Sequence, residues 1–247
     1  MLLLLASGAF AQAQTAPDAW IKQISGDVIE TVKGDRAIQG GDTKKVMALS
    51  QGAKTAFIPQ CGLAPGFITI AANHVIQGMT DMHEVKMRVG ALPEFPSNAL
   101  KYNLTWSTDG LINEYIMPCE AVIDGRVTVV PALEGLEHMM IEGIEFEAFN
   151  TSGGLGTFAL TLEGKVRHLS YKTMRYPGHN AILKLLLWDL GFREHRNELK
   201  AAFERALPTT KQDIVAIFVS AAGKVGGTYT ERTYAKIVRH KEIGGHH

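Results

Sequence analysis

The sequence predicts an α+β domain whose sheet is mostly antiparallel or mixed and is covered by helices on one face, without a complete Rossmann domain. Two observations carry this prediction. Several segments alternate apolar and polar residues, as residues 84–92 do, and short turns join neighbouring strands with few helices between them. A dinucleotide fingerprint, G-x-G-x-x-G, is missing, because residues 62–66 have the wrong spacing and residues 154–156 lack the third glycine.

The first elements are a helix over residues 41–54, which Asp42 or Thr43 can cap, and a short strand over residues 55–59. A helix is expected over residues 66–78. Pro65 suits its first turn and Gly78 ends its apolar run.

Residues 84–92 and 101–106 alternate with a period of two and are predicted as strands. Ser107 stands before residues 108–115 as a helix cap, with Asp109 in the first turn where the helix dipole favours an acid. Strands over 119–124 and 126–132 are expected to form a hairpin across the turn Asp124-Gly125. The later elements are a strand over 144–152, an amphipathic segment over 157–164, a strand over 165–176, helices over 179–191 and 194–206, and strands over 213–223 and 228–238.

The charge balance argues against nucleic acid as a partner. The 247 residues contain 25 Lys and Arg against 25 Asp and Glu, so neither sign dominates. Cys61 and Cys119 are too few for a disulfide scaffold and lack zinc spacing, and the histidines show no ligand pattern, so no metal site is expected. A reducing compartment, and with it a cytoplasmic location, fits best.

The N-terminus offers one alternative to this location. Residues 2–10 could be the apolar core of a signal peptide, which would mean export, but no basic residue precedes them. A short leader or a miscalled start over residues 1–15 is the favoured interpretation. No run reaches the roughly 20 apolar residues that a membrane-spanning helix needs, so no membrane is expected as a partner.

Several polar residues could hold a ligand, and each has a structural alternative. Arg175 lies at a strand end and could clamp a carboxylate, whereas a solvated sheet face is favoured for Arg88. Glu114 could meet an ammonium group, although a surface role is favoured, and His179 could carry a proton, although a satisfied structural histidine is favoured. Anion pockets or simple caps are expected at Ser107, Thr108, Asn150, Thr151 and Ser152.

Four segments, taken in order, resemble the saccharopine dehydrogenase and lysine dehydrogenase family in its substrate-binding and dimerisation portion. They are "CGLAPGF" at 61–67, residues 90–115, "FNTSGGLGT" at 149–157 and "YKTMRYPGH" at 171–179. The resemblance implies the fold of the C-terminal domain of saccharopine reductases. It also implies an NAD- or NADP-dependent oxidoreductase that acts on a C–N bond of an amino acid, by proton removal and hydride transfer to give an imine.

The resemblance also implies roles for particular residues, while the catalytic residues stay unknown. Residues implied to lie near the cofactor are Cys61, Gly62, Leu63, Ala64, Pro65 and Gly66. Residues implied to bind the amino-acid substrate are Asn98, Lys101, Tyr102, Ser107, Asn150, Thr151, Ser152, Arg175 and Tyr176.

The missing fingerprint leaves two functions open. Residues 16–54 would be a remnant or replacement of the nucleotide-binding region, residues 55–240 the substrate-binding and dimerisation domain, and residues 241–247 a tail. The chain would then be an incomplete oxidoreductase, a homodimer that a separate nucleotide-binding subunit could complete. Alternatively, it is a noncatalytic amino-acid-binding or dimerising domain that has lost the cofactor half.

Overall fold

The computed structural model describes residue 51 and residues 59–241, and the latter belong to one compact unit. The leader expected over residues 1–15 and nearly all of the region expected over residues 16–54 lie outside the described residues. So do most of the expected strand over residues 55–59 and nearly all of the tail. The expected domain boundaries therefore stay a prediction.

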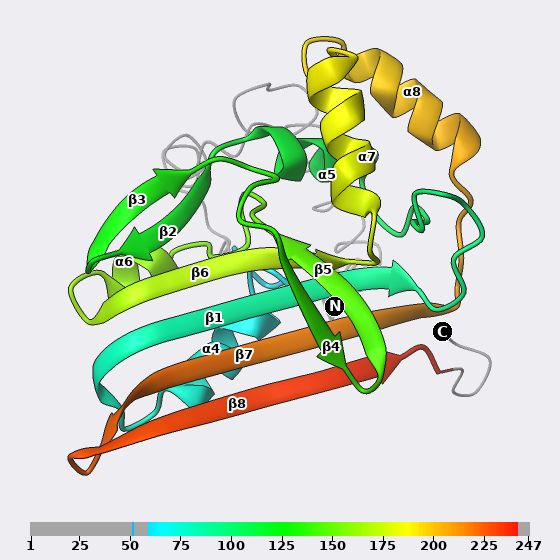
Figure 1. Cartoon of the computed structure of the whole chain (residues 1–247). Coiled ribbons are helices and arrows are strands. Elements are labelled where there is room, and N and C mark those ends of the chain that lie inside the picture. Colours follow the sequence, from blue (N-terminus) through cyan, green and yellow to red (C-terminus); the bar gives the residue numbers. More distant parts are fainter. Residues whose placement is uncertain (1–50, 52–58, 242–247) are drawn as a thin grey trace, which may run out of the picture. The chain divides into compact units, whose positions relative to one another are not determined.

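An eight-stranded sheet forms the centre of the described unit (Figure 1). The strand order is β3-β2-β6-β1-β7-β8, and the hairpin β4–β5 joins β6 through β5. Only β1 and β6 pair in parallel among the paired strands, with Arg88 opposite Lys172. The predicted α+β class with a mostly antiparallel, mixed sheet is confirmed. The strands are β1 (Thr80–Pro93), β2 (Cys119–Ile123), β3 (Arg126–Val130), β4 (Glu137–Ile141), β5 (Ile144–Phe149), β6 (Val166–Arg175), β7 (Asp213–Val225) and β8 (Thr228–Arg239).

The first hydrophobic core lies between the sheet and two helices, α4 (Phe67–Val75) and α6 (Phe158–Leu162). Alternate residues of β1, Val85, Met87 and Val89, are buried on this face, as the period-two pattern predicts. In Figure 1, α4 and α6 lie behind the sheet, where Ile68 and Ala72 of α4 join the same core. Helix α4 thereby fixes the glycine-rich stretch that precedes it against the sheet.

The second core lies where β6 ends and the chain turns into α7. Here α5 (Thr108–Ile116), α7 (His179–Lys184), the π-helical turn η1 (Leu185–Asp189) and α8 (Arg196–Ala206) come together (Figure 1). Ser107 caps α5 as predicted, because its side chain accepts a hydrogen bond from Gly110 N. This core surrounds the end of β6, where Arg175 is located.

Three expectations from the sequence are wrong. Residues 101–106 form no strand, since Lys101 has a φ of 53° and the consecutive residues Tyr102 and Asn103 are both buried, which a half-exposed strand does not allow. Strand β4 was not expected, although Glu142 and Gly143, both with positive φ, form a hairpin turn after it. Arg88 is 1% exposed instead of solvated.

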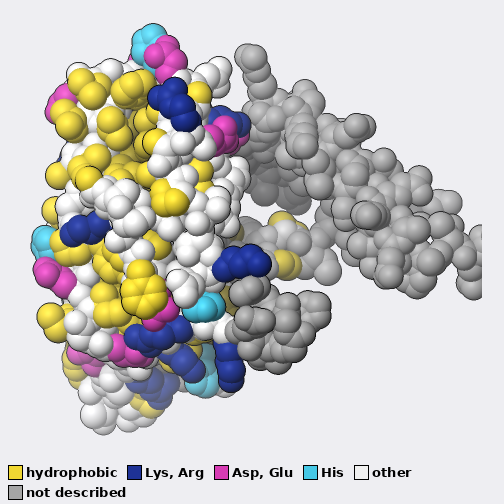
Figure 2. Space-filling model, turned by 90° about the vertical axis from the view of Figure 1, so that its right-hand side faces the viewer, with side chains coloured by type: hydrophobic (Ala, Val, Ile, Leu, Met, Phe, Trp, Pro, Cys, Tyr) yellow, Lys and Arg dark blue, Asp and Glu magenta, His cyan; other side chains and the backbone are white. Residues whose placement is uncertain are grey.

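Charged side chains of both signs lie among hydrophobic ones on the side of the molecule that Figure 2 shows. None of the helices in the described part of the chain is long and apolar enough to cross a membrane.

Candidate functional site

The two glycine-rich bends of the sequence, residues 61–66 and 153–156, lie against each other. Gln60 Oε1 accepts hydrogen bonds from the backbone N of Thr157 at 3.2 Å and from its hydroxyl at 3.4 Å. Gly156 has a φ of 52°, and a Cβ there would lie 2.2 Å from Gln60 Oε1 and 3.0 Å from Pro65 Cβ. Glycine is therefore required for the second bend to approach the first.

The first bend is closed by its own backbone hydrogen bonds. Gly62 N donates to Pro65 O at 3.0 Å, Phe67 N to Gly62 O at 2.9 Å and Ile68 N to Leu63 O at 3.0 Å. Gly66 has a φ of 143°, and a Cβ there would lie 2.0 Å from Gly62 O. Since these amides at the start of α4 are already bonded within the bend, they do not form a cradle for a pyrophosphate.

Arg175, at the end of β6, is the buried cation of the second core and is 3% exposed. Its Nη1 donates to Thr173 Oγ1 at 2.8 Å and to Met174 O at 2.9 Å, and its Nε donates to the Tyr115 hydroxyl at 2.9 Å. The guanidinium lies over the ring of Tyr102, 5.0 Å from its centroid, which is a cation–π distance.

His179 fixes the direction of this hydrogen-bond chain. Its Nδ1 lies 2.9 Å from Leu100 O, a carbonyl that can only accept, so Nδ1 carries the proton. Burial, together with the charge of Arg175, lowers the pKa of His179 to about 3 and keeps the ring neutral. Its Nε2, 3.0 Å from the Tyr115 hydroxyl, therefore accepts from Tyr115, which accepts from Arg175. His179 is therefore a satisfied structural histidine, as the favoured interpretation predicts, because it is buried and both of its ring nitrogens are hydrogen-bonded.

Glu114 is the carboxylate beside Arg175. Its Oε2 lies 3.8 Å from Arg175 Nη2, which is too long for a hydrogen bond. Among the described residues, Nη2 has no hydrogen-bond acceptor, whereas Nε and Nη1 both do. Burial outweighs the attraction of Arg175 and raises the pKa of Glu114 to about 7. Glu114 is only partly exposed, at 23% of its side chain, and pairs with Arg175 instead of standing free at the surface.

Among the expected substrate-binding residues, Tyr102 is the one whose ring contacts Arg175, and Asn98 and Lys101 hold the segment that carries it. Lys101 Nζ donates to Pro177 O at 3.0 Å, just after β6. Asn98 Nδ2 donates to Tyr102 O at 2.7 Å, and the Tyr102 hydroxyl accepts from Trp106 Nε1 at 3.0 Å. The Tyr102 ring thus covers one side of the guanidinium.

The residues Thr151 and Ser152 lie on the other side of Glu114. Ser152 N donates to Glu114 O at 3.1 Å, and Ser152 Oγ donates to Asn113 O at 3.3 Å. Thr151 is 3% exposed, and its hydroxyl has no hydrogen-bond partner among the described residues.

The remaining expected residues make local contacts elsewhere. The Tyr176 hydroxyl donates to Pro93 O at 2.8 Å, Asn150 Nδ2 donates to Pro131 O at 3.2 Å, and Ser107 caps α5. Substrate binding by the nine expected residues stays a prediction.

Sequence reasoning missed Tyr115 and Glu147. Tyr115 bonds Arg175 and His179, which lie 60 and 64 residues further along the sequence, a pairing that no local pattern signals. Glu147 is 3% exposed, and its carboxylate accepts from Gly178 N and Asn180 N at the start of α7. The sequence holds no signal for Glu147, because Glu145 and Glu147 alternate with apolar residues as on an ordinary half-exposed strand, yet only Glu145 is exposed.

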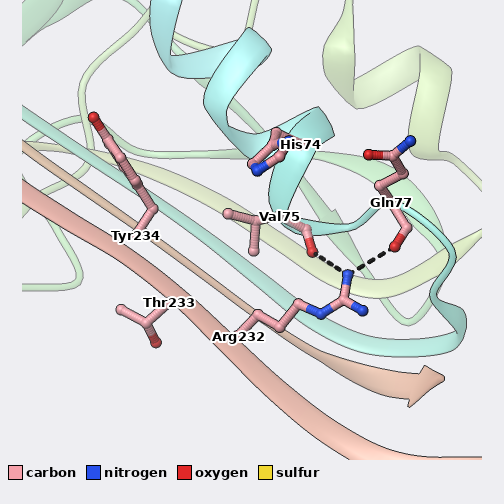
Figure 3. Close-up of a pocket in the computed structure, with 6 residues that line it drawn as sticks. All are labelled: His74, Val75, Gln77, Arg232, Thr233 and Tyr234. Carbon is pink, nitrogen blue, oxygen red and sulfur yellow. Dashed lines mark hydrogen bonds between the residues drawn. The ribbon is translucent and has the colours of Figure 1, made fainter.

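A separate cavity of about 640 Å³ lies between the end of α4 and β8 (Figure 3). Arg232 points into it and donates from Nη1 to Val75 O at 3.3 Å and to Gln77 O at 2.7 Å, so the guanidinium caps the helix. None of the expected site residues lines this cavity. Over residues 59–241, no cluster of three His, Cys, Asp or Glu side chains could hold a metal ion.

Residues 62–235 match the sequence model of the saccharopine dehydrogenase C-terminal domain, and the chain therefore belongs to this family. A solved structure described as "Apo histidine-tagged saccharopine dehydrogenase (L-Glu forming) from Saccharomyces cerevisiae" is similar, with a TM-score of 0.55 and 15% sequence identity. The similarity covers 74% of this chain and 60% of the yeast chain. It shows a shared fold, and this chain spans only part of that relative.

Proposed function

We propose that this chain is a saccharopine dehydrogenase-like oxidoreductase chain whose described residues hold the substrate, an amino acid of the saccharopine or lysine type. The observation that supports this most is the state of Arg175, a buried cation whose Nη2 has no hydrogen-bond acceptor among the described residues. A guanidinium with one open edge is suited to a carboxylate, which it can bind through two parallel hydrogen bonds.

The surroundings of Arg175 favour an anion with an apolar body. Tyr102 and Tyr115 place their rings beside the guanidinium, within cation–π distance. Arg175 stays charged although burial opposes its charge. Trp106, which is 44% exposed, lies at the outer side of Tyr102. These aromatic groups would bury the methylene chain of a lysine-type substrate.

The described residues do not fit the cofactor. Gly62 N in the bend and the first two amides of α4 are bonded to carbonyls of the bend, and no parallel strand–glycine–helix unit of the dinucleotide-binding kind is present among residues 59–241. When bound, NAD or NADP supplies the hydride acceptor of such an oxidoreductase. In this proposal the nucleotide is held outside the described residues or by a separate nucleotide-binding subunit, and residues 61–66 approach it as backbone.

The open edge of Arg175 also favours a second function, a noncatalytic amino-acid-binding or dimerising domain. Both functions require amino-acid binding at Arg175, and they differ in nucleotide binding. Titration of the full chain with NADH and NADPH separates them, because saturable nucleotide binding favours the oxidoreductase. The homodimer stays a proposal, which the molecular mass measured by light scattering tests.

Substrate binding at Arg175 is tested by thermal unfolding of the full chain with L-saccharopine and L-lysine. A ligand that binds only the folded state raises the melting temperature. We expect this rise in the wild type and in the control Arg126→Met, whose side chain is exposed on β3, but not in Arg175→Met. Circular dichroism establishes that Arg175→Met is folded, and Arg175→Lys, which keeps the charge, should bind weakly. A rise that persists undiminished in Arg175→Met would contradict the proposed function.

A further inference from the structure

We infer that Glu114 receives the α-ammonium group of the bound amino acid while Arg175 receives its carboxylate. This inference rests on the proposed function and assigns the two ends of the same ligand. Glu114 Oε2 and Arg175 Nη2 lie 3.8 Å apart, so a negative and a positive group stand side by side without closing a hydrogen bond. The two groups of an α-amino acid carry the complementary charges on adjacent carbon atoms.

The exposures of the two side chains differ. The Arg175 side chain is 4% exposed and the Glu114 side chain is 23% exposed, so Glu114 is the more solvent-accessible member of the pair. A ligand at the open edge of Arg175 would lie beside the Glu114 carboxylate, because the two groups are 3.8 Å apart. A carboxylate without an ammonium group would be repelled there, whereas a zwitterion would not.

A second observation supports a ligand at this place. The Thr151 hydroxyl is buried and has no partner among the described residues, a state that costs free energy unless a further group bonds it. Thr151 precedes Ser152, whose amide donates to the carbonyl of Glu114. The segment that carries this unsatisfied hydroxyl is therefore held directly against Glu114.

The other titratable groups around Glu114 stay neutral at ordinary pH. Burial raises the pKa values of Tyr115 and Tyr171, both of which feel the charge of Glu114, and it raises that of the Cys119 thiol to about 12. Arg175 stays charged. Glu114, with its pKa near 7, is then the group of this described cluster that changes charge around neutral pH. An ammonium ligand favours the charged carboxylate, so its binding must release a proton at pH 7.

The test compares α-amino acids with analogues that lack the α-ammonium group. L-lysine is paired with 6-aminohexanoate, and L-glutamate with glutarate, in calorimetric titrations of the full chain at pH 6, 7 and 8 in two buffers of different ionisation heat. We expect the affinity for the amino acids to rise by about tenfold from pH 6 to pH 8, since a carboxyl with a pKa of about 7 becomes charged over this range, with proton release at pH 7. The analogues should show no such rise.

Glu114→Gln should weaken amino-acid binding about tenfold at pH 8 and abolish both the pH dependence and the proton release. The matched control is Asp109→Asn on the same helix, whose carboxylate pairs with Lys200 at the surface, and it should behave as the wild type. If L-lysine and L-glutamate bind through Arg175 with unchanged pH dependence in Glu114→Gln, the inference is overturned and the proposed function stands. If neither amino acid binds the wild type, the proposed function itself fails.

Discussion

Arg88 and Arg175 are both buried, on the paired strands β1 and β6, but they differ in how their charge is satisfied. All three nitrogens of Arg88 donate hydrogen bonds, and both carboxylate oxygens of Glu137 accept from it. Arg175 bonds a phenol, a hydroxyl and a carbonyl, and its nearest carboxylate lies 3.8 Å away. A buried guanidinium that is hydrogen-bonded to its carboxylate serves the fold, whereas one with only a long ion pair, as Arg175 has with Glu114, keeps an edge that can serve a ligand.

The two carboxylates, Glu137 beside Arg88 and Glu114 beside Arg175, have pKa values that are shifted in opposite directions. Burial alone would raise the pKa of Glu137, but hydrogen bonds and charges from Arg88 and Lys172 outweigh burial and lower it. Lys172 Nζ lies 2.7 Å from Glu137 Oε2. Glu114 has no such bonds and its pKa is raised. The Arg88 network is therefore closed and the Arg175 network open.

The largest expected effect is the loss of stability in Arg88→Met. Removing one partner of a buried ion pair leaves the other uncompensated, and because Lys172 still faces Glu137 we expect a loss near the lower end of the usual range, about 3 kcal/mol. Arg175→Met should cost less, about 1–2 kcal/mol, since Glu114 can take up a proton instead. Urea unfolding at pH 7 measures both.

The control for this pair is Arg126→Met, an exposed position where the change should stay within about 0.5 kcal/mol. A larger loss in Arg175→Met than in Arg88→Met would show that Arg175 is also a closed structural pair.

The sequence predicts the sheet well and the Arg88 network poorly, for one physical reason. The alternation of Val85, Met87 and Val89 is local, and it predicts β1 because strand geometry places alternate residues on one face. The same alternation places Arg88 on the opposite face, which is solvated in an isolated sheet. It is buried because Glu137 of β4 bonds it from 49 residues away, and such a pairing leaves no local signal.

In the candidate site, too, features with a local sequence pattern could be predicted and features that depend on distant contacts could not. Arg175 could be singled out, because a cation at a strand end before Pro177-Gly178 is visible in the sequence. Glu114 could be named as a possible partner of an ammonium group but not placed beside Arg175, and Tyr115 gave no signal, because both placements depend on how α5 packs against the end of β6. Residues 101–106 alternate like a strand, yet they form the loop that covers Arg175, since a six-residue pattern does not distinguish the two.

The next prediction concerns stability in acid, where the two regions respond over different ranges. His179 has a pKa near 3 in the folded protein, whereas an unfolded histidine has a pKa near 6.5. The unfolded chain therefore binds a proton that the folded chain does not, and stability present above pH 6.5 is lost as the pH falls toward 3. Glu137, with a lowered pKa, contributes stability that is lost only below the unfolded value of 4.5.

His179→Gln isolates the first range. Glu114 acts in the opposite direction, because its raised pKa makes the stability decrease as the pH rises from 4.5 to 7. The difference in stability between wild type and variant cancels this contribution and is therefore the quantity to compare. We expect the variant to lose about 1–3 kcal/mol at pH 7, where a buried hydrogen bond is broken, and less at pH 5. Urea unfolding at both values measures this. An equal loss at pH 5 and pH 7 would mean that folding does not lower the pKa of His179.

The smallest expected effect is that of Ser170→Ala. The Ser170 hydroxyl accepts from Arg88 Nη1 and Nη2, both at 3.2 Å, while the Ser170 carbonyl and Glu137 keep their bonds to the guanidinium, so the loss should be about 1 kcal/mol. Its counterpart is Thr173→Val, which removes the hydroxyl that accepts from Arg175 Nη1. Both variants are compared by urea unfolding and by titration with L-lysine.

Because the Arg88 network is closed, Ser170→Ala should leave the affinity for L-lysine unchanged, whereas Thr173→Val should weaken it, since Arg175 loses a hydrogen bond that holds it in place. If the affinity for L-lysine changes in Ser170→Ala and not in Thr173→Val, the ligand binds at Arg88 instead of Arg175.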